Sequence, residues 1–226
     1  MVELTHKDST ISMRTTYDLI VFDLDGTLSD PMQGISRSIN HALKHYGYKE
    51  REPSELAQYI GPPLNEAFEA LVNSTQKSVI SALVTKYRER YSEVGFSENI
   101  LYSGVREALL QLSQAGIPTG VMHFKAWNFA ERILRMFGLS EFFLFVDGGD
   151  IGVEKRQQIA NLCVQGIVTP ASIMVGDRAV DIIAAHENGL QAGGVLWGYG
   201  SVAELKNQRP QHLFNSPSEW SLLRGG

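Results

Sequence analysis

The sequence has little of what marks secreted, membrane or nucleic-acid-binding proteins. Its single cysteine, Cys163, excludes an internal disulfide and fits a reducing compartment, so we expect a cytoplasmic protein. No apolar run approaches the about 20 residues that a membrane helix needs. The net charge of −5 gives no basic excess of the kind that binds nucleic acid. We therefore expect neither nucleic acid nor a membrane among its partners.

The beginning of the chain also lacks a targeting signal. Residues 1–16 include charged side chains and no apolar segment, so we expect a loose N-terminal tail rather than a secretory signal. The chain as a whole is 43% hydrophobic and 20% charged, which suits a globular protein with a substantial core. Its 226 residues allow one large domain or two modest ones.

What the chain does contain is a strand that ends in two carboxylates. Residues 19–22 are an unbroken apolar run, typical of a strand covered on both faces of a parallel sheet. Asp23 and Asp25 follow, and then Gly26 and Thr27 form a turn. Buried carboxylates are costly without a cation, and ligands bind at the carboxyl ends of such strands. One hypothesis is a metal-assisted site with a nucleophilic and an acid/base carboxylate. The alternative, an Asx turn at Asp25, leaves Asp23 unexplained.

A second strand end carries another pair of acids. The apolar residues 173–175 lead into Gly176 and Asp177, and Asp181 follows one helical turn later, so both acids can point to one place. Alternatively, Asp181 caps a helix over residues 182–188. Carboxylates that share one point cannot all ionise unless a cation is present. Magnesium prefers oxygen ligands, so these acids are candidate ligands for Mg²⁺.

The order of strands and helices predicts an α/β fold. Residues 102–226 alternate apolar strands, one of them expected over 142–146, with amphipathic helices, which implies right-handed crossovers and a parallel sheet. Residues 31–101 have helical spacing and no convincing strand. We predict a doubly wound, Rossmann-like core made of residues 17–30 and 102–226, interrupted by a helical insertion over 31–101.

These motifs resemble those of a known family. Residues 23–28, DLDGTL, resemble the first motif, DxDGT[L/V], of the haloacid dehalogenase superfamily of phosphohydrolases. Residues 176–181 resemble its fourth motif, GDxxxD. The resemblance extends from residue 18 to about residue 220 and looks closest to the phosphoglycolate phosphatase and 5′-nucleotidase-like branch. It implies that the insertion is an α-helical cap domain, whose loop over residues 60–64 closes over the substrate.

The resemblance implies a chemistry and a role for each acid. The chain would be a Mg²⁺-dependent phosphate-monoester hydrolase acting on a small phosphorylated metabolite, as a monomer or weak dimer. Asp23 would be the nucleophile that forms an aspartyl-phosphate, and Asp25 would act first as acid and then as base. Asp23, the backbone carbonyl of Asp25 and Asp177 would bind Mg²⁺, and Asp181 would support it.

Two further residues are candidates for contact with phosphate. Lys155 begins an amphipathic helix in the register of the lysine in the family's third motif, and would compensate the developing charge. The alternative is an ordinary surface lysine at a helix start. The hydroxyl of Thr27, in the first motif, is a second candidate.

The second motif departs from the family pattern, in which a strand ends in Thr or Ser, often followed by Ser-Lys-Pro. Here the strand ends in His123, which takes the place of the hydroxyl, and Phe124, Lys125 and Trp127 follow. One interpretation is a shifted register that gives His123 no role. Another is a phosphatase with a weakened clamp, in which His123, Phe124 and Lys125 contact phosphate.

A remodelled site is the remaining interpretation of this segment. His123 with Asp23 and Asp177 would welcome Zn²⁺ or Mn²⁺, or His123 would act as a general base beneath an aromatic pocket of Phe124 and Trp127. The chain would then be a repurposed or engineered scaffold whose phosphatase activity is lost or replaced. A carbon–halogen dehalogenase, which shares the fold, needs no magnesium and usually lacks the second acid of the first motif. Asp25, Asp177 and Asp181 together argue against it.

Overall fold

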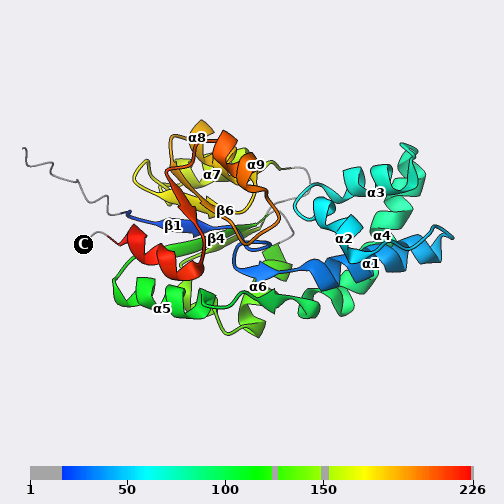
Figure 1. Ribbon diagram of the computed structural model, residues 1–226, viewed down its shortest axis with the longest axis horizontal. Helices are drawn as coiled ribbons and strands as arrows, with labels where there is room; N and C mark the ends of the chain where they lie inside the picture. The colour runs from blue at the N-terminus through cyan, green and yellow to red at the C-terminus, as the bar shows by residue number, and fades with distance from the viewer. Residues whose placement is uncertain (1–16, 124–126, 149–152, 225–226) are drawn as a thin grey trace, which may run out of the picture.

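The computed structural model describes residues 17–123, 127–148 and 153–224. The chain has two parts, an α/β core and a helical lobe beside it (Figure 1). The core sheet is parallel throughout, with the strand order β5-β4-β1-β6-β7-β8. Its strands are β1 (Ile20–Phe22), β4 (Thr119–His123), β5 (Val146–Gly148), β6 (Ile173–Gly176), β7 (Gln191–Val195) and β8 (His212–Phe214).

The central strand β1 explains why the sheet is buried on both faces. Ile20 and Phe22 belong to a hydrophobic cluster on one face, and Leu19 and Val21 belong to a cluster on the other. Successive side chains of a strand point to opposite faces, so an unbroken apolar run fits only a strand that is covered on both. The predicted two-sided strand is therefore confirmed.

Helices cover the two faces of the sheet. One face packs against α5 (Val105–Gln114), α6 (Trp127–Met136) and η4 (Pro217–Leu223). The other packs against α7 (Lys155–Val164), α8 (Ala179–Glu187) and α9 (Val202–Asn207). In Figure 1 the two groups lie on opposite sides of the strands. The predicted fold class, a doubly wound parallel sheet with an inserted helical cap, is confirmed.

The inserted lobe, which we call the cap, has a hydrophobic cluster of its own. Its elements are α1 (Met32–His45), α2 (Pro53–Leu56), η1 (Ala57–Tyr59), α3 (Leu64–Val72), α4 (Lys77–Glu93) and η2 (Gly95–Glu98). A short antiparallel pair, β2 (Ser29–Asp30) and β3 (Ile100–Leu101), joins it to the core. The expectation of no strand within residues 31–101 was therefore wrong at β3, which is too short to show a periodic pattern.

Two further expectations were wrong at their boundaries. The apolar run 142–146 is not one strand, because η3 (Ser140–Phe142) includes its first residue and β5 begins only at Val146. Phe142 and Phe143 pack against the core cluster instead of pairing in the sheet, and Leu144 is exposed. Helix α8 begins at Ala179, three residues before the expected start.

The position of β1 between β4 and β6 determines where a ligand site can lie. The chain leaves β1 toward β4 and β5 on one side and then crosses to β6 and β7 on the other. In open α/β sheets, ligands bind at such a switch point, at the carboxyl ends of the strands. The residues that follow β1, β4 and β6 therefore meet at one edge of the sheet.

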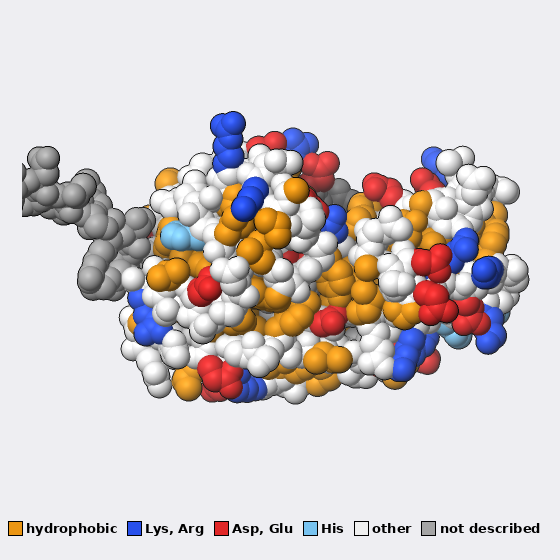
Figure 2. Space-filling model, in the orientation of Figure 1, with side chains coloured by type: hydrophobic (Ala, Val, Ile, Leu, Met, Phe, Trp, Pro, Cys, Tyr) orange, Lys and Arg blue, Asp and Glu red, His pale blue; other side chains and the backbone are white. Residues whose placement is uncertain are grey.

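The surface shows no dominant charge on the face in view. Figure 2 shows Lys and Arg side chains scattered over the core and the cap rather than gathered in one stripe. Among the residues that the structure describes, no helix has both the length and the apolarity needed to cross a membrane.

Candidate active site

Three carboxylates meet where β1 and β6 end. Asp23 directly follows β1, and its backbone N–H donates to the carbonyl of Val175 in β6 at 2.9 Å. Asp177 directly follows β6, and Asp181 lies in the first turn of α8. One oxygen from each of Asp23, Asp177 and Asp181 lies within 4.8 Å of the others. Adjacent parallel strands thus bring together acids that are 154 residues apart, from Asp23 to Asp177.

The turn after β1 explains the glycine of the first motif. Gly26 has a φ of +82°, in the left-handed region, and its N–H donates to the carbonyl of Ser29 at 2.8 Å. A Cβ atom at Gly26 would overlap the carboxylate of Asp177, and so would one at Gly198. Glycine therefore allows two loops to approach the same acid closely.

Lys155 lies among these acids. It is the first residue of α7, and its side chain is 3% exposed. Its Nζ lies 2.7 Å from Oδ1 of Asp23 and also donates to Asp181. Burial lowers the pKa of Lys155, but the charges of Asp181 and Asp23 outweigh burial and raise it above its ordinary value. The alternative of a surface lysine does not describe this side chain.

The charge on the cluster is not balanced by Lys155 alone. Burial raises the pKa of Asp23, but Lys155 and His123 outweigh it and hold the pKa at about 2. Burial and the charges of Asp181 and Asp23 raise the pKa of Asp177 well above its usual range. The pKa of Asp181 is also raised, chiefly by burial. Asp23 is thus held ionised, while at Asp177 the positive charge of Lys155 does not offset burial and the charges of the neighbouring acids.

These features fit a hard divalent cation. Oδ2 of Asp177 accepts from the N–H of Tyr199 at 2.8 Å, but its buried Oδ1 has no hydrogen-bond partner among the described residues. An unpartnered carboxylate oxygen, in a group made only of carboxylates, matches the oxygen ligands that Mg²⁺ and Ca²⁺ prefer. Asp23, Asp177 and Asp181 are therefore the residues that could hold a metal.

Asp181 is not the N-cap residue of its helix, as the alternative proposed, although its carboxylate takes part in the cap. It is the third residue of α8, and its Oδ2 accepts from the backbone N–H of Arg178 at 3.0 Å, while its Oδ1 accepts from Lys155. Because the helix begins earlier than the sequence suggested, the side chain of Asp181 points back toward the ends of the strands. Its carboxylate is 1% exposed.

His123 lies beside the two acids of the first motif. It is the last residue of β4 and is buried. Its Nδ1 lies 3.7 Å from Oδ1 of Asp23, and its Nε2 lies 3.7 Å from Oδ2 of Asp25. Both separations are too long for a hydrogen bond, and neither ring nitrogen has such a partner among the described residues. His123 is not part of the group formed by Asp23, Asp177 and Asp181.

The remaining predicted site residues are described only in part. Thr27 is fully buried, and its Oγ1 has no hydrogen-bond partner among the described residues. Phe124 and Lys125 lie outside the described residues, so their predicted contacts stay predictions. Trp127 begins α6, but its side chain is outside the described part as well.

Three residues near the acids were not predicted. Tyr199 binds Asp177 through its backbone N–H and Asp30 through its hydroxyl. Tyr91 of the cap is buried, and its pKa is raised mainly by burial and also by the charge of Asp25. Arg178 connects the core to the cap. Only Arg178 and Tyr199 carried a signal in the sequence, because each lies within a few residues of a glycine and of the carboxyl end of a strand.

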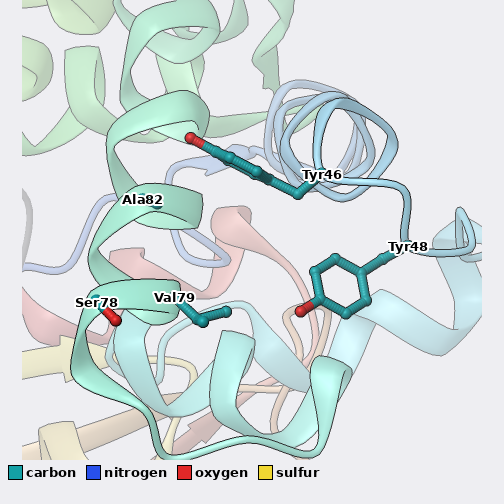
Figure 3. Close-up of a pocket in the computed structure, with 5 residues that line it drawn as sticks. All are labelled: Tyr46, Tyr48, Ser78, Val79 and Ala82. Carbon is teal, nitrogen blue, oxygen red and sulfur yellow. The ribbon is translucent and has the colours of Figure 1, made fainter.

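A separate pocket lies on the cap, away from these acids. Its volume is about 290 Å³, and Figure 3 shows its lining side chains around the end of α1 and the beginning of α4: Tyr46, Tyr48, Ser78, Val79 and Ala82. It contains no carboxylate, histidine or amine that could support the chemistry indicated by the acid cluster.

The chain matches a family model over most of its length. Residues 20–195 match the model described as "Haloacid dehalogenase-like hydrolase". The matched segment includes both predicted motifs and His123, so the unusual second motif lies within an otherwise recognisable family sequence.

Several known proteins are similar over nearly the whole chain. A 5′-nucleotidase from Pseudomonas aeruginosa is 35% identical over 87% of this chain and 90% of that protein. A phosphoglycolate phosphatase from Vibrio parahaemolyticus is 30% identical over 89% of this chain and 93% of its own. The tyrosine-protein kinase PtkA of Mycobacterium tuberculosis is 35% identical over 80% of this chain and 63% of its own.

A solved structure agrees with these relatives. A haloacid dehalogenase-like family hydrolase from Streptococcus pneumoniae aligns with a TM-score of 0.84 at 28% sequence identity. The alignment covers 92% of this chain and 97% of that structure.

Proposed function

Because the chain belongs to the haloacid dehalogenase-like hydrolase family and is a phosphatase-type hydrolase, we propose that it is a Mg²⁺-dependent phosphate-monoester hydrolase. The observation that carries the proposal is the position of Asp23, which directly follows the central strand, lies 2.7 Å from Lys155 and has a pKa of about 2. A carboxylate that stays ionised in a buried site is a nucleophile ready for phosphoryl transfer.

The first step is attack by a carboxylate oxygen of Asp23 on phosphorus. The P–O bond to the leaving alcohol breaks, and Asp25 gives its proton to the leaving oxygen. In the second step Asp25 takes a proton from water, and the hydroxyl attacks phosphorus, so that phosphate leaves and Asp23 is restored. Asp25 follows Asp23 by two residues, on the tight turn that Gly26 permits.

Asp23, Asp177 and Asp181 would hold Mg²⁺, and the backbone carbonyl of Asp25 would join them. The bound ion would supply positive charge to the phosphoryl oxygens. Lys155 keeps Asp23 ionised and orients its carboxylate through the contact with Oδ1. Asp181, held by Lys155 and by the N–H of Arg178, fixes the position of that lysine.

His123 replaces the hydroxyl that usually contacts phosphate in this family. Its ring lies within 3.7 Å of both Asp23 and Asp25, so it can donate a hydrogen bond to a phosphoryl oxygen placed between them. The hydroxyl of Thr27 and the residues Phe124 and Lys125 complete the proposed phosphate contacts.

The substrate we propose is a small phosphorylated metabolite, since the described catalytic side chains are nearly inaccessible beneath the cap; Asp25, for example, is 7% exposed. We propose residues 17–30 and 102–226 as the core, 31–101 as the cap, a monomer or weak dimer, and a cytoplasmic location. The relatives' substrates, a 5′-nucleotide and phosphoglycolate by their names, are the first two to test.

A second hypothesis is favoured by the same histidine. The imidazole of His123 is larger than a hydroxyl and lies where the phosphoryl group would sit, beside both acids. The chain would then be a repurposed or engineered scaffold, with lost phosphatase activity, altered metal binding or a new histidine-based activity. A dehalogenase is the weakest alternative, because it has no use for Asp177 and Asp181.

The test is hydrolysis of p-nitrophenyl phosphate with and without Mg²⁺. We expect Mg²⁺-dependent turnover, and a loss of about a thousandfold or more in Asp23→Asn. The matched control is Asp18→Asn. Asp18 lies just before the opposite end of β1, where it accepts from Ser172 at 2.8 Å, so this variant should keep the activity.

The same assay on His123→Thr separates the two hypotheses. If the parent is inactive and the Thr variant is active, the histidine has displaced the phosphatase function. Turnover that needs no Mg²⁺ in either protein would remove the metal assignment. Unchanged activity in Asp23→Asn would show that this residue is not the nucleophile.

A further inference from the structure

Arg178 connects the metal-binding segment to the cap. It directly follows Asp177, and its side chain is 24% exposed. Its Nε lies 2.9 Å from Oε1 of Glu204 in α9, within the core. Its Nη1 donates to the backbone carbonyl of Ile60 in the cap at 2.8 Å, across 118 residues of sequence. One guanidinium therefore contacts both parts of the molecule.

The core side of this connection is fixed. Oε1 of Glu204 also accepts from the backbone N–H of Ala179 at 2.8 Å. The backbone N–H of Arg178 donates to Asp181, which in turn binds Lys155. The backbone N–H and the Nε of Arg178 are thus held by groups of the core, and Nη1 binds the cap.

The cap side is adapted to receive this side chain. Ile60 directly follows η1 and is buried in the hydrophobic cluster of the cap. The next residue, Gly61, has a φ of +103°, and a Cβ atom there would lie 3.2 Å from Nη1 of Arg178. A larger residue would therefore be strained and would crowd the guanidinium. The loop over residues 60–64 thus meets the core through a backbone oxygen and a glycine.

We propose that Arg178 is a positioning residue that holds the loop over residues 60–64 closed on the catalytic acids. Asp23, Asp177 and Lys155 are at most 5% exposed, so the cap must open for a substrate to enter. Opening breaks the bond from Nη1 to Ile60, while the bond from Nε to Glu204 stays. The same arginine directly follows a metal-site acid, so the residue that holds the loop closed lies beside the acid cluster. The effect on catalysis rests on the proposed phosphatase function, but the role of Arg178 in holding the loop closed does not.

A lysine cannot replace this arginine fully. The guanidinium offers donors in a rigid fork, which lets it bind Glu204 and Ile60 at the same time, whereas a lysine has a single ammonium group. We therefore expect Arg178→Lys to be intermediate between the parent and Arg178→Ala. Arg132→Ala is the matched control. Arg132 also reaches from the core to a cap carbonyl, that of Ser92 at 3.2 Å, but it lies on α6, away from the acids.

The first measurement is amide hydrogen exchange in residues 57–64 of the full chain, without substrate. We expect exchange to be about tenfold faster in Arg178→Ala, which corresponds to about 1.4 kcal/mol and is what loss of a charged hydrogen bond predicts. Arg132→Ala should leave exchange in these residues unchanged. Equal exchange in the parent and Arg178→Ala, or the same acceleration in both alanine variants, would overturn the proposal.

The second measurement separates positioning from damage to the acids. With p-nitrophenyl phosphate and Mg²⁺, Arg178→Ala should raise KM about tenfold and change kcat much less, with partial recovery in Arg178→Lys. The increase in melting temperature caused by Mg²⁺ alone should match that of the parent. A lost response to Mg²⁺ would mean that the arginine only supports Asp177, and would refute the proposal that it holds the loop closed. If the parent shows no turnover, the proposed function fails, and hydrogen exchange still tests whether Arg178 holds the loop closed. If Arg178→Ala does not fold, the exchange comparison is made with Arg178→Lys.

Discussion

Replacing Asp177 by Asn should stabilise the metal-free protein and remove its stabilisation by Mg²⁺. Burial and two neighbouring acids raise the pKa of Asp177, so the folded state binds its proton more tightly than the unfolded state does. The stability of the metal-free protein therefore falls as the pH rises above 3.8, the ordinary value for this group. Asn carries no charge, and its side-chain oxygen can still accept from the N–H of Tyr199.

The magnitude follows from the unpartnered Oδ1 of Asp177. A buried polar atom without a partner costs about 1–3 kcal/mol. For a chain of this length, each kcal/mol shifts the melting temperature by about 2–4 °C, so the variant should melt about 2–12 °C above the metal-free parent. A bound ion at a hundred times its dissociation constant adds about 2.7 kcal/mol to the parent, or about 5–11 °C. The variant should gain none of this.

The assay is thermal unfolding in EDTA and in excess Mg²⁺, at pH 5 and pH 8. In EDTA the advantage of Asp177→Asn should be larger at pH 8 than at pH 5, because the parent carboxylate is more fully ionised there. The control Asp18→Asn changes a carboxylate next to the other end of the same strand, and should retain the full response to Mg²⁺. It should show no gain in EDTA, since Asp18 is hydrogen-bonded to Ser172.

Two outcomes would refute the reasoning. If Asp177→Asn melts below the parent in EDTA at pH 8, the charge of Asp177 is compensated in the folded protein. If it still gains stability from Mg²⁺ as the parent does, the ion binds elsewhere. A loss of the Mg²⁺ response in Asp18→Asn would show that the response does not report the acid cluster.

Two further predictions concern ion pairs. Lys155→Met leaves Asp23 and Asp181 without their buried ammonium, so urea unfolding should show a loss of about 3–5 kcal/mol; stability equal to the parent would contradict this. Glu98→Gln in the cap should cost about 1 kcal/mol at pH 7. Hydrogen bonds from Arg90 and Arg37 outweigh burial and lower the pKa of Glu98. The stability that ionised Glu98 adds to the folded protein is therefore present above pH 4.5 and is lost as the pH falls through the lowered pKa. An equal loss at pH 7 and pH 2 would refute this cause.

Local pattern was enough to predict much of this molecule. Apolar runs that end in acids predict the strand before Asp23 and the strand before Asp177, and helix α7 begins at Lys155 as expected. Such signals depend on neighbours a few residues apart. The acid pair, the candidate lysine and the fold class therefore followed from short segments.

Local pattern failed where packing chose between alternatives. Phe142 and Phe143 are apolar enough for a strand. Phe142 instead ends the 3₁₀ turn η3, Phe143 follows it, and both pack against the core. Asp181 suits the N-cap position by residue type, yet the helix starts earlier, and its carboxylate binds both the N–H of Arg178 and Lys155. In both cases the competing conformations differ by contacts with distant segments.

The sequence by itself determined which acids this protein has and that they end two buried strands, because strand periodicity and turn chemistry are local. Only the tertiary structure decided that β1 lies between β4 and β6, which brings Asp23, His123 and Asp177 to one edge. The hydrogen bonds from Arg178 to Ile60 and from Tyr199 to Asp177 also follow only from the tertiary structure. Those contacts depend on the order of the strands and on how the cap rests on the core, and both are set by burial summed over the whole chain.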